Sequence, residues 1–465
     1  MIFQRLAFSV KRPAFSVQRP ASSVKRPAFF KNLLLLMMKK IILLALLFSV
    51  SAAYSQESLN VIDIKETERI ERMLSSDEMQ GRRTFSAGIE KAGAFIASEF
   101  EKTGLQKWAN SGSYMQTFSM IKAKSLTQHY SIDGNEIDKK NVLLLCPTKN
   151  IRVNEKSNYD IVQVSKGMNF FREIMKSLSA KKNTVVVADT SFSKLLGRFT
   201  QMEMDLFSTQ SNVIVILATD IPKKFNIEAT QEIIEQPLSN VVGIIPGKSK
   251  PNEYVIFSGH YDHLGIMSAN MEKSDSIYNG ANDDAAGTTA MIMLSKYYKA
   301  LNNNERTLIF AAFTAEEVGG FGAQYFSKQF DPASVVAMFN IEMIGTESKW
   351  GTNSAYITGF EKTNMGAILQ KNLTNTKFTF YPDPYTDQNL FYRSDNATLA
   401  RLGVPAHTIS TSKMDSEPNY HKASDEIGTL NLENMTAIIR AIALSAKGIV
   451  DGKDTPTRVD TSMLK

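Results

Sequence analysis

The most regular pattern of apolar and polar positions lies in the second half of the chain, from residue 239 onward. Continuous apolar runs rich in β-branched and aromatic residues alternate there with longer amphipathic segments. Such runs are typical of strands whose two faces are both buried by helices. In order, the pattern predicts strand, strand, helix, strand, helix and strand at 240–247, 254–262, 285–301, 307–317, 322–330 and 335–345. We therefore expect an α/β fold, a three-layer sandwich with a mixed, mostly parallel central sheet flanked by helices.

The first half is less regular. Segment 66–105 carries apolar residues at helical spacing on both sides of QGRR (80–83), which predicts two amphipathic helices, the second ending at Gly104. Residues 120–238 contain no chemical motif, and we expect a small α/β insertion of unknown role. Its pattern predicts strands at 142–145, 183–189 and 212–220 and a helix at 170–180.

These patterns divide the chain into five expected parts. They are a leader (1–55), N-terminal helices that belong to the main domain (56–119), the insertion (120–238), the main domain itself (239–452) and a tail (453–465).

The leader has the features of a signal peptide. Lys39 and Lys40 precede the apolar run IILLALLFSV, and small residues lie just before an expected cut ahead of Gln56. This predicts export to the periplasm or the medium, with no stable membrane insertion after cleavage. The alternative is an uncleaved anchor, although the run is shorter than the ~20 residues of a spanning helix. Three repeats of the type AFSVKRP precede Met38, which we expect to be the true start.

Charge and cysteine content limit the range of functions that the sequence supports. The chain has 53 Lys and Arg against 47 Asp and Glu, but nine of the basic residues and none of the acidic ones precede Glu57. The remainder, with 44 basic residues against 47 acidic ones, gives no support for nucleic-acid binding through bulk charge. Cys146 is the only cysteine, so an intrachain disulfide and a cysteine-based metal site are excluded. Any metal must be held by histidine and carboxylate ligands.

Polar clusters follow the predicted strands of the main domain. Taken alone, each is most simply a hydrogen-bonded residue at a strand end, a helix cap or a solvated pair. Together they gather at one sheet edge, where several carboxylates would repel one another unless a cation were present. We therefore predict a divalent metal site. The residues concerned are His260, Asp262, Asn282, Asp283, Asp284, Glu316, Glu317, Glu342 and His421.

Five motifs in this order resemble the co-catalytic dizinc aminopeptidases. They are GHYDHLG (259–265), GANDDAAG (280–287), AEEVGG (315–320), NIEMIG (340–345) and YHKASDE (420–426). The relatives of that family include glutamate carboxypeptidases, glutaminyl cyclases and the transferrin receptor. The resemblance covers about 66–120 and 239–450, and the joint occurrence of the motifs makes it specific.

The resemblance implies two zinc ions bridged by Asp283. His260 and Glu342 would complete one site, and Glu317 and His421 the other. The family usually has Asp where this chain has Glu342. This longer side chain implies a displaced second metal, a withdrawn backbone or a preference for another ion such as manganese, and partial occupancy of that site.

Two further residues receive roles from the resemblance. Glu316 would be the general base, and Asp262 would accept the second ring N–H of His260 and so orient it. A cis peptide bond is implied between Asp283 and Asp284. His263 is not required by the family pattern, and we expect it to be a local structural residue.

The segment RSDNATLARLGVPA (393–406) departs from the family, because Asn396 replaces a histidine. We assign Asn396 no role. Arg393 could bind a substrate carboxylate, but a surface salt bridge is the simpler expectation.

The resemblance favours an exported zinc aminopeptidase that acts on peptides with a free N-terminus. One alternative is a carboxypeptidase or glutaminyl cyclase on the same scaffold. The other is a non-catalytic, receptor-like binding module, which the complete set of metal-binding groups disfavours.

Overall fold

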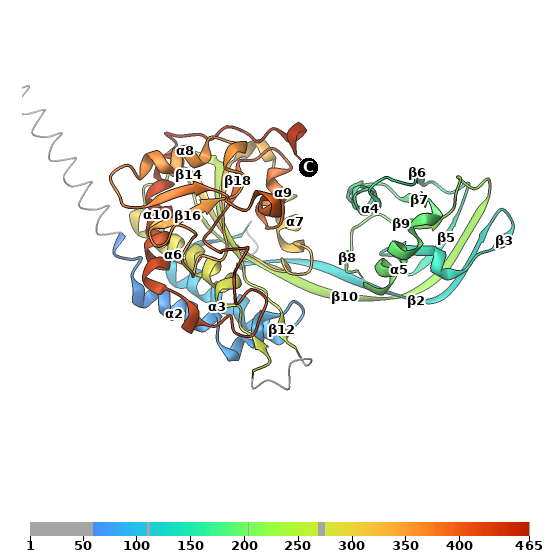
Figure 1. Cartoon of the computed structure of the whole chain (residues 1–465), viewed down its shortest axis with the longest axis horizontal. Helices are drawn as coiled ribbons and strands as arrows, with labels where there is room; N and C mark the ends of the chain where they lie inside the picture. Colours follow the sequence, from blue (N-terminus) through green and yellow to red (C-terminus); the bar gives the residue numbers. More distant parts are fainter. Residues whose placement is uncertain (1–58, 109–111, 203, 268–274, 465) are drawn as a thin grey trace, which may run out of the picture. The chain divides into compact units, whose positions relative to one another are not determined.

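The computed structural model describes residues 59–108, 112–202, 204–267 and 275–464 (Figure 1). The predicted signal peptide and the start at Met38 lie outside these residues. Within the described residues, no helix is both long enough and apolar enough to cross a membrane.

A mixed sheet organises the main domain. Its strands lie in the order β17, β16, β18, β15, β11, β14, β10 and β2. The neighbours β14, β11, β15 and β18 run parallel, whereas β10 and β16 pair with this group in the antiparallel sense. The mixed, mostly parallel sheet expected from the sequence is thus confirmed. The strands are β2 (Met115–Ile132), β10 (Phe225–Ile245), β11 (Lys250–His260), β14 (Arg306–Phe313), β15 (Val335–Ile341), β16 (Ser354–Ile357), β17 (Thr379–Pro382) and β18 (Ala406–Ser410).

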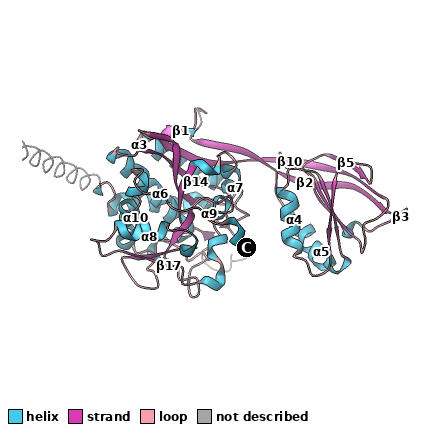
Figure 2. Ribbon diagram, turned by 90° about the horizontal axis from the view of Figure 1, so that it is seen from above, coloured by secondary structure: helices cyan, strands magenta, loops and turns pink. Residues whose placement is uncertain are grey.

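Helices cover both faces of this sheet, as Figure 2 shows. Side chains alternate across a strand, so Val255 and Phe257 pack into one core while Ile256 between them packs into the other. This explains why the strand sequences are continuously apolar. The first core is covered by α2 (Ile64–Leu74), α3 (Ala87–Thr103), α6 (Ala286–Leu301), α8 (Met365–Asn372), α10 (Leu432–Ser445) and α11 (Lys447–Val450), and the second by α7 (Phe321–Ser327) and α9 (Asn396–Ala400).

The two N-terminal helices expected from the sequence are confirmed. The side chain of Asp63 caps α2, and Ser86 caps α3. Gly104 ends α3 in the left-handed conformation at φ 74°. Between the helices, Gly81 also has positive φ, and a Cβ there would lie 2.4 Å from the carbonyl oxygen of Tyr278. Only glycine fits at this close approach.

The insertion contains a second sheet of four strands in the order β4, β9, β7 and β6. Helices α4 and α5 cover one of its faces, and parts of β2, β5 and β10 pack on the other. The three strands and the helix predicted here are confirmed. The expected boundaries at 119/120 and 238/239 fall inside the long strands β2 and β10. The elements are β4 (Val142–Leu145), β5 (Asn150–Asn154), β6 (Asp160–Val164), α4 (Phe170–Ser179), β7 (Thr184–Ala188), α5 (Ser193–Met202) and β9 (Val213–Leu217).

The aromatic stack at the centre of the sheet predicts a large stability effect. The fully buried ring of Phe257 stacks on Phe310 and Phe339, with centroids 5.6 and 4.8 Å away. Phe257→Ala is expected to lower the free energy of unfolding by ~3–5 kcal/mol, because it leaves a cavity in a packed core. Phe171, which is 57% exposed in the insertion, is the matched control, and Phe171→Ala should change stability by no more than ~0.5 kcal/mol. Chemical denaturation measures both, and similar losses would contradict this packing.

Candidate metal centre

The site lies where the parallel strands end. β11 ends at His260, β14 ends shortly before Glu316 and Glu317, and β15 ends one residue before Glu342. Because β14, β11 and β15 are parallel neighbours, these ends meet at one edge of the sheet.

His260 is held by the loop that follows it. Its Nδ1–H lies 3.1 Å from the backbone carbonyl of Asp262, while the nearer carboxylate oxygen of Asp262 is 3.7 Å away. The carboxylate instead accepts the backbone N–H groups of Glu316 at 3.0 Å and Glu317 at 3.2 Å, and the hydroxyl of Thr84 at 3.3 Å. The expected contact between the His260 ring and the Asp262 carboxylate is therefore longer than a hydrogen bond. Asp262 orients the ring mainly through its carbonyl, and its carboxylate fixes the two glutamates.

Asp283 lies between two histidine rings. Its Oδ1 is 3.3 Å from Nε2 of His260, and its Oδ2 is 3.2 Å from Nε2 of His421. The loop that carries Asp283 is held by Asp425, whose two carboxylate oxygens accept the backbone N–H groups of Asn282 and Asp283 at 2.9 and 3.0 Å. A carboxylate between two histidines can bridge two metal ions.

The next residue, Asp284, has a structural role. The peptide bond between Asp283 and Asp284 is cis, as the resemblance implied. The Asp284 carboxylate accepts backbone N–H groups from His260 at 3.1 Å and from Gly287 and Met343 at 3.0 Å each. Asp284 therefore links the end of β11, the start of α6 and the segment after β15.

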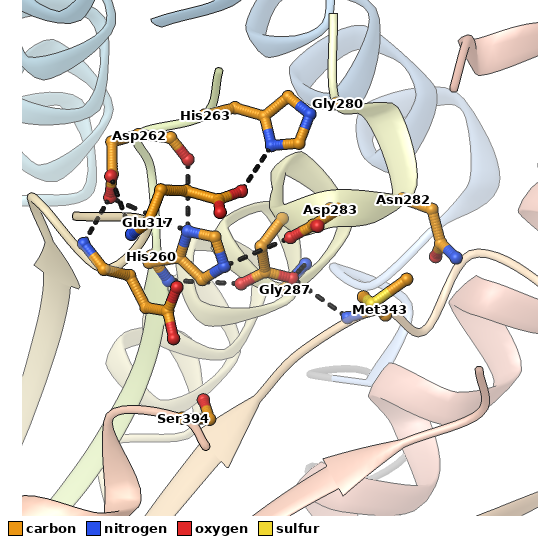
Figure 3. Close-up of polar contacts among 12 residues, drawn as sticks. His260, Asp262, His263, Gly280, Asn282, Asp283, Gly287, Glu317, Met343 and Ser394 are labelled. Carbon is orange, nitrogen blue, oxygen red and sulfur yellow. Dashed lines mark hydrogen bonds and ion pairs between the residues drawn. The ribbon is translucent and has the colours of Figure 1, made fainter. Parts of the chain in front are cut away.

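Glu317 contacts two histidines. One carboxylate oxygen lies 3.2 Å from Nε2 of His421, and the other accepts the Nδ1–H of His263 at 2.7 Å (Figure 3). The His263 ring is buried and packs against the Cα of Gly280, where a Cβ would lie 2.5 Å from it. The view of His263 as only a local structural residue is therefore incomplete. The spacing of the two histidines in GHYDHLG was the available signal.

Two groups of side chains place candidate ligand atoms within 4.8 Å of one another. One consists of His260, Asp283 and Glu342, and the other of His263, Asp283 and Glu317. His421 joins the second group through its contacts with Asp283 and Glu317. The structure thus brings together all five residues expected to bind metal and adds His263 beside them.

The electrostatics of these residues fit divalent cations. Burial raises the pKa of Glu316 well above its usual value, and burial together with neighbouring carboxylates raises that of Glu342. Burial acts in the same direction on Asp283, but the adjacent rings of His260 and His421 outweigh it and lower that pKa. The buried Nε2 atoms of His260 and His263 hydrogen-bond to no described group. Clustered carboxylates beside unpartnered imidazole nitrogens form a donor set suited to zinc.

The site opens into a cavity. Asp283, Glu316, Glu317, Glu342 and His421 line one side of it. The rest includes apolar and aromatic side chains, namely Met343, Tyr356, Leu390, Met414 and Tyr420. An acidic floor and an apolar wall can hold a small organic substrate.

Arg82, in the QGRR segment, connects the opening helices to the site. This fully buried guanidinium donates hydrogen bonds to four backbone carbonyls. They belong to Leu74 and Asn279 at 2.6 Å, Tyr261 at 2.8 Å and Gly280 at 2.9 Å. The loop after β11 and the loop before α6 are thereby fixed to one side chain.

The structure shows the surroundings of Asn396 and Arg393, the two residues considered in the segment 393–406. Asn396 is fully buried, donates to the carbonyls of Phe391 and Ala406 and accepts from the hydroxyl of Thr408, so it holds the backbone together. Arg393 lines the cavity. Within the described part of the chain its guanidinium forms no ion pair, and its one hydrogen bond, to Gln388, is 3.5 Å long. The expected surface salt bridge is therefore wrong.

Comparison with known proteins agrees with the motifs. Residues 240–446 match the model of Peptidase family M28. A probable zinc metalloprotease from Pyrenophora teres f. teres is 33% identical over 110 residues, which are 23% of this chain and 23% of that protein. The match thus spans about a quarter of the length of this curated relative. The resemblance drawn from the motifs is confirmed by the family match over 240–446.

Solved structures show the same fold. The aminopeptidase from Aneurinibacillus sp. strain AM-1 aligns with a TM-score of 0.51 and 14% identity over 88% of this chain and 98% of its own. A zinc aminopeptidase from Bacillus subtilis aligns with a TM-score of 0.51 and 16% identity over 85% and 97%. At this identity the likeness concerns the fold, which agrees with the expected three-layer sandwich.

The contact between His263 and Glu317 predicts an effect on metal binding. His263→Leu is expected to weaken zinc binding by roughly 10–100-fold, because Glu317 loses the donor that orients its carboxylate. His263→Asn, whose amide can replace the Nδ1–H, should recover part of the affinity. Competition titration against a chromophoric chelator measures both. His129→Leu, at an exposed position on β2, should bind as the wild type does. Wild-type affinity in His263→Leu would show that Glu317 needs no such support.

Proposed function

We propose that this chain is an exported, zinc-dependent aminopeptidase that removes N-terminal residues from peptides. One observation carries the proposal: Glu316 and four of the five candidate ligands line one cavity at the carboxyl edge of the sheet, and the fifth, His260, lies beside Asp283, in a segment that matches a peptidase family. Zinc is supported by the donor set and by the metalloprotease relatives. Export is supported by the apolar run after Lys39 and Lys40.

In this proposal, Asp283 would contribute to both of two zinc sites. His260 and Glu342 would hold one ion, and Glu317 and His421 would hold the other. When bound, the ions supply positive charge that acidifies a water molecule and polarises the scissile carbonyl. The neutral His260 ring is kept in the required tautomer, because its Nδ1–H faces the carbonyl of Asp262 and its Nε2 faces Asp283.

Glu316 acts as the general base. Its backbone N–H is fixed by Asp262, and its side chain lines the cavity, as does that of its neighbour Glu317. Ala315 before it has φ of 60°, a conformation that alanine rarely adopts and that turns the chain sharply at the end of β14. The Glu316 carboxylate takes the proton from the attacking water and returns it to the leaving amine. The apolar wall formed by Tyr356, Leu390 and Met414 limits access of other water.

Glu342 would serve where the family usually has aspartate. Its carboxylate lies close to Ser394 and in one group with His260 and Asp283. We propose that the longer side chain reaches the same ion and that Ser394 limits its freedom. Metal analysis of the purified protein, with zinc and manganese supplied together, would show which ion this site prefers.

Replacement of the general base is expected to lower turnover without changing the zinc content. Glu316→Gln should lower kcat by roughly 10²–10⁴-fold, because the amide cannot accept the proton, while the zinc content stays at the wild-type value. Peptide hydrolysis and metal analysis of the same sample provide the two readouts. Glu433→Gln, an exposed exchange in the first turn of α10, should leave both unchanged. Wild-type turnover in Glu316→Gln would reject this mechanism.

The direction of cleavage can be read from products. The chain from Gln56 onward, loaded with zinc, is expected to shorten peptides stepwise from free N-termini and to spare N-acetylated ones. Mass spectrometry of a mixed peptide pool, with a chelated sample as control, measures this. C-terminal trimming would indicate a carboxypeptidase. Loss of ammonia from peptides that begin with Gln would indicate a glutaminyl cyclase, and complete inertness would indicate a binding module.

A further inference from the structure

Arg393 is the one Lys or Arg side chain that lines the cavity within the described residues. It is exposed, and no carboxylate of the described chain neutralises it. An arginine in a cavity lined by carboxylates would ordinarily pair with one of them. Its single long hydrogen bond to Gln388 leaves most of its donors available.

The backbone fixes the position of Arg393 beside the metal-binding groups. It directly follows the short 3-10 helix Leu390–Tyr392, and its N–H donates to the carbonyl of Leu390 at 3.1 Å. Residues three apart in such a helix lie on the same side, and both Leu390 and Arg393 line the cavity. The next residue, Ser394, lies close to the carboxylate of Glu342, and its hydroxyl accepts a hydrogen bond from Asn340 at 2.7 Å. Arg393 is therefore anchored one residue from a contact with a proposed metal ligand.

The free donors of Arg393 then favour an anion in the cavity. Its guanidinium lines the same cavity as Glu316, Glu317 and Glu342 but forms no ion pair within the described residues. A guanidinium also presents a planar fork of donors that matches a carboxylate.

We propose that Arg393 binds a carboxylate of the substrate within one residue of the scissile bond. The enzyme would then prefer dipeptides, through their C-terminal carboxylate, or peptides that begin with Asp or Glu. This inference rests on the aminopeptidase function proposed above and adds a substrate class to it.

Two pairs of substrates distinguish the sources of the carboxylate. Leu-Gly and Leu-Gly-amide differ only in the C-terminal carboxylate, whereas Glu-Gly-amide and Gln-Gly-amide differ only in the side chain. In at least one pair, the wild type should favour the charged member by roughly 10–100-fold in kcat/KM, the range expected for one charge-assisted contact. The pair that shows the preference identifies the carboxylate.

Variants then test whether Arg393 is the cause. In Arg393→Met the ratio within that pair should fall toward one, and in Arg393→Lys it should take an intermediate value. The control is Arg401→Met, whose guanidinium lies over the ring of Tyr392, 5.8 Å from its centroid and outside the cavity lining. It should keep the wild-type ratio.

Each result has a defined meaning. Equal rates within both pairs in the wild type, or a ratio retained in Arg393→Met even if both rates fall, would overturn the inference. Hydrolysis of the uncharged Leu-Gly-amide tests the aminopeptidase itself. If that substrate is cleaved but no ratio differs from one, only the inference about Arg393 fails. If no substrate with a free N-terminus is cleaved, the proposed function fails with it.

Discussion

The mutual repulsion of carboxylates at one sheet edge is the constraint on which the rest of this structure depends. Glu316, Glu317 and Glu342 follow parallel strands that end side by side, and the turn before α6 adds Asp283. Burial alone raises the free energy of their charged forms, and their proximity raises it further. His260 and His421 offset part of this cost through contacts with Asp283. Divalent cations would offset the remainder. The positive charge that this group of carboxylates requires would thus come from bound ions and not only from side chains.

A second layer of residues keeps these groups in place, and its members come from distant parts of the chain. Asp262 holds the backbone of the two glutamates, Asp425 holds the loop of Asp283, and His263 holds Glu317. Arg82, from the segment between the opening helices, holds the carbonyls of two loops. The N-terminal helices are therefore part of the metal centre, although none of their residues is a candidate ligand.

The cavity combines chemistry of two kinds. One part of its lining consists of candidate ligands and Glu316, with Glu342 close to Ser394. The other part comes from segments after β15 that have no regular pattern, and these supply Tyr356, Leu390, Arg393 and Met414. A group of carboxylates and a largely apolar surface thus meet at the same sheet edge.

The sequence by itself determined the alternating strands and helices of the main domain, because strands buried on both faces must be continuously apolar. It also determined the candidate ligands and Glu316, because their motifs stand at strand ends in a recognisable order. Only the tertiary structure decided the partners of these groups. The contact of His263 with Glu317 and the long strands β2 and β10 shared with the insertion depend on segments far apart in the chain. The same holds for the Asp262 carboxylate, which binds backbone N–H groups 54 and 55 residues away. Local sequence patterns do not predict such long-range contacts, because these hydrogen bonds form only after the sheet has brought its strand ends together.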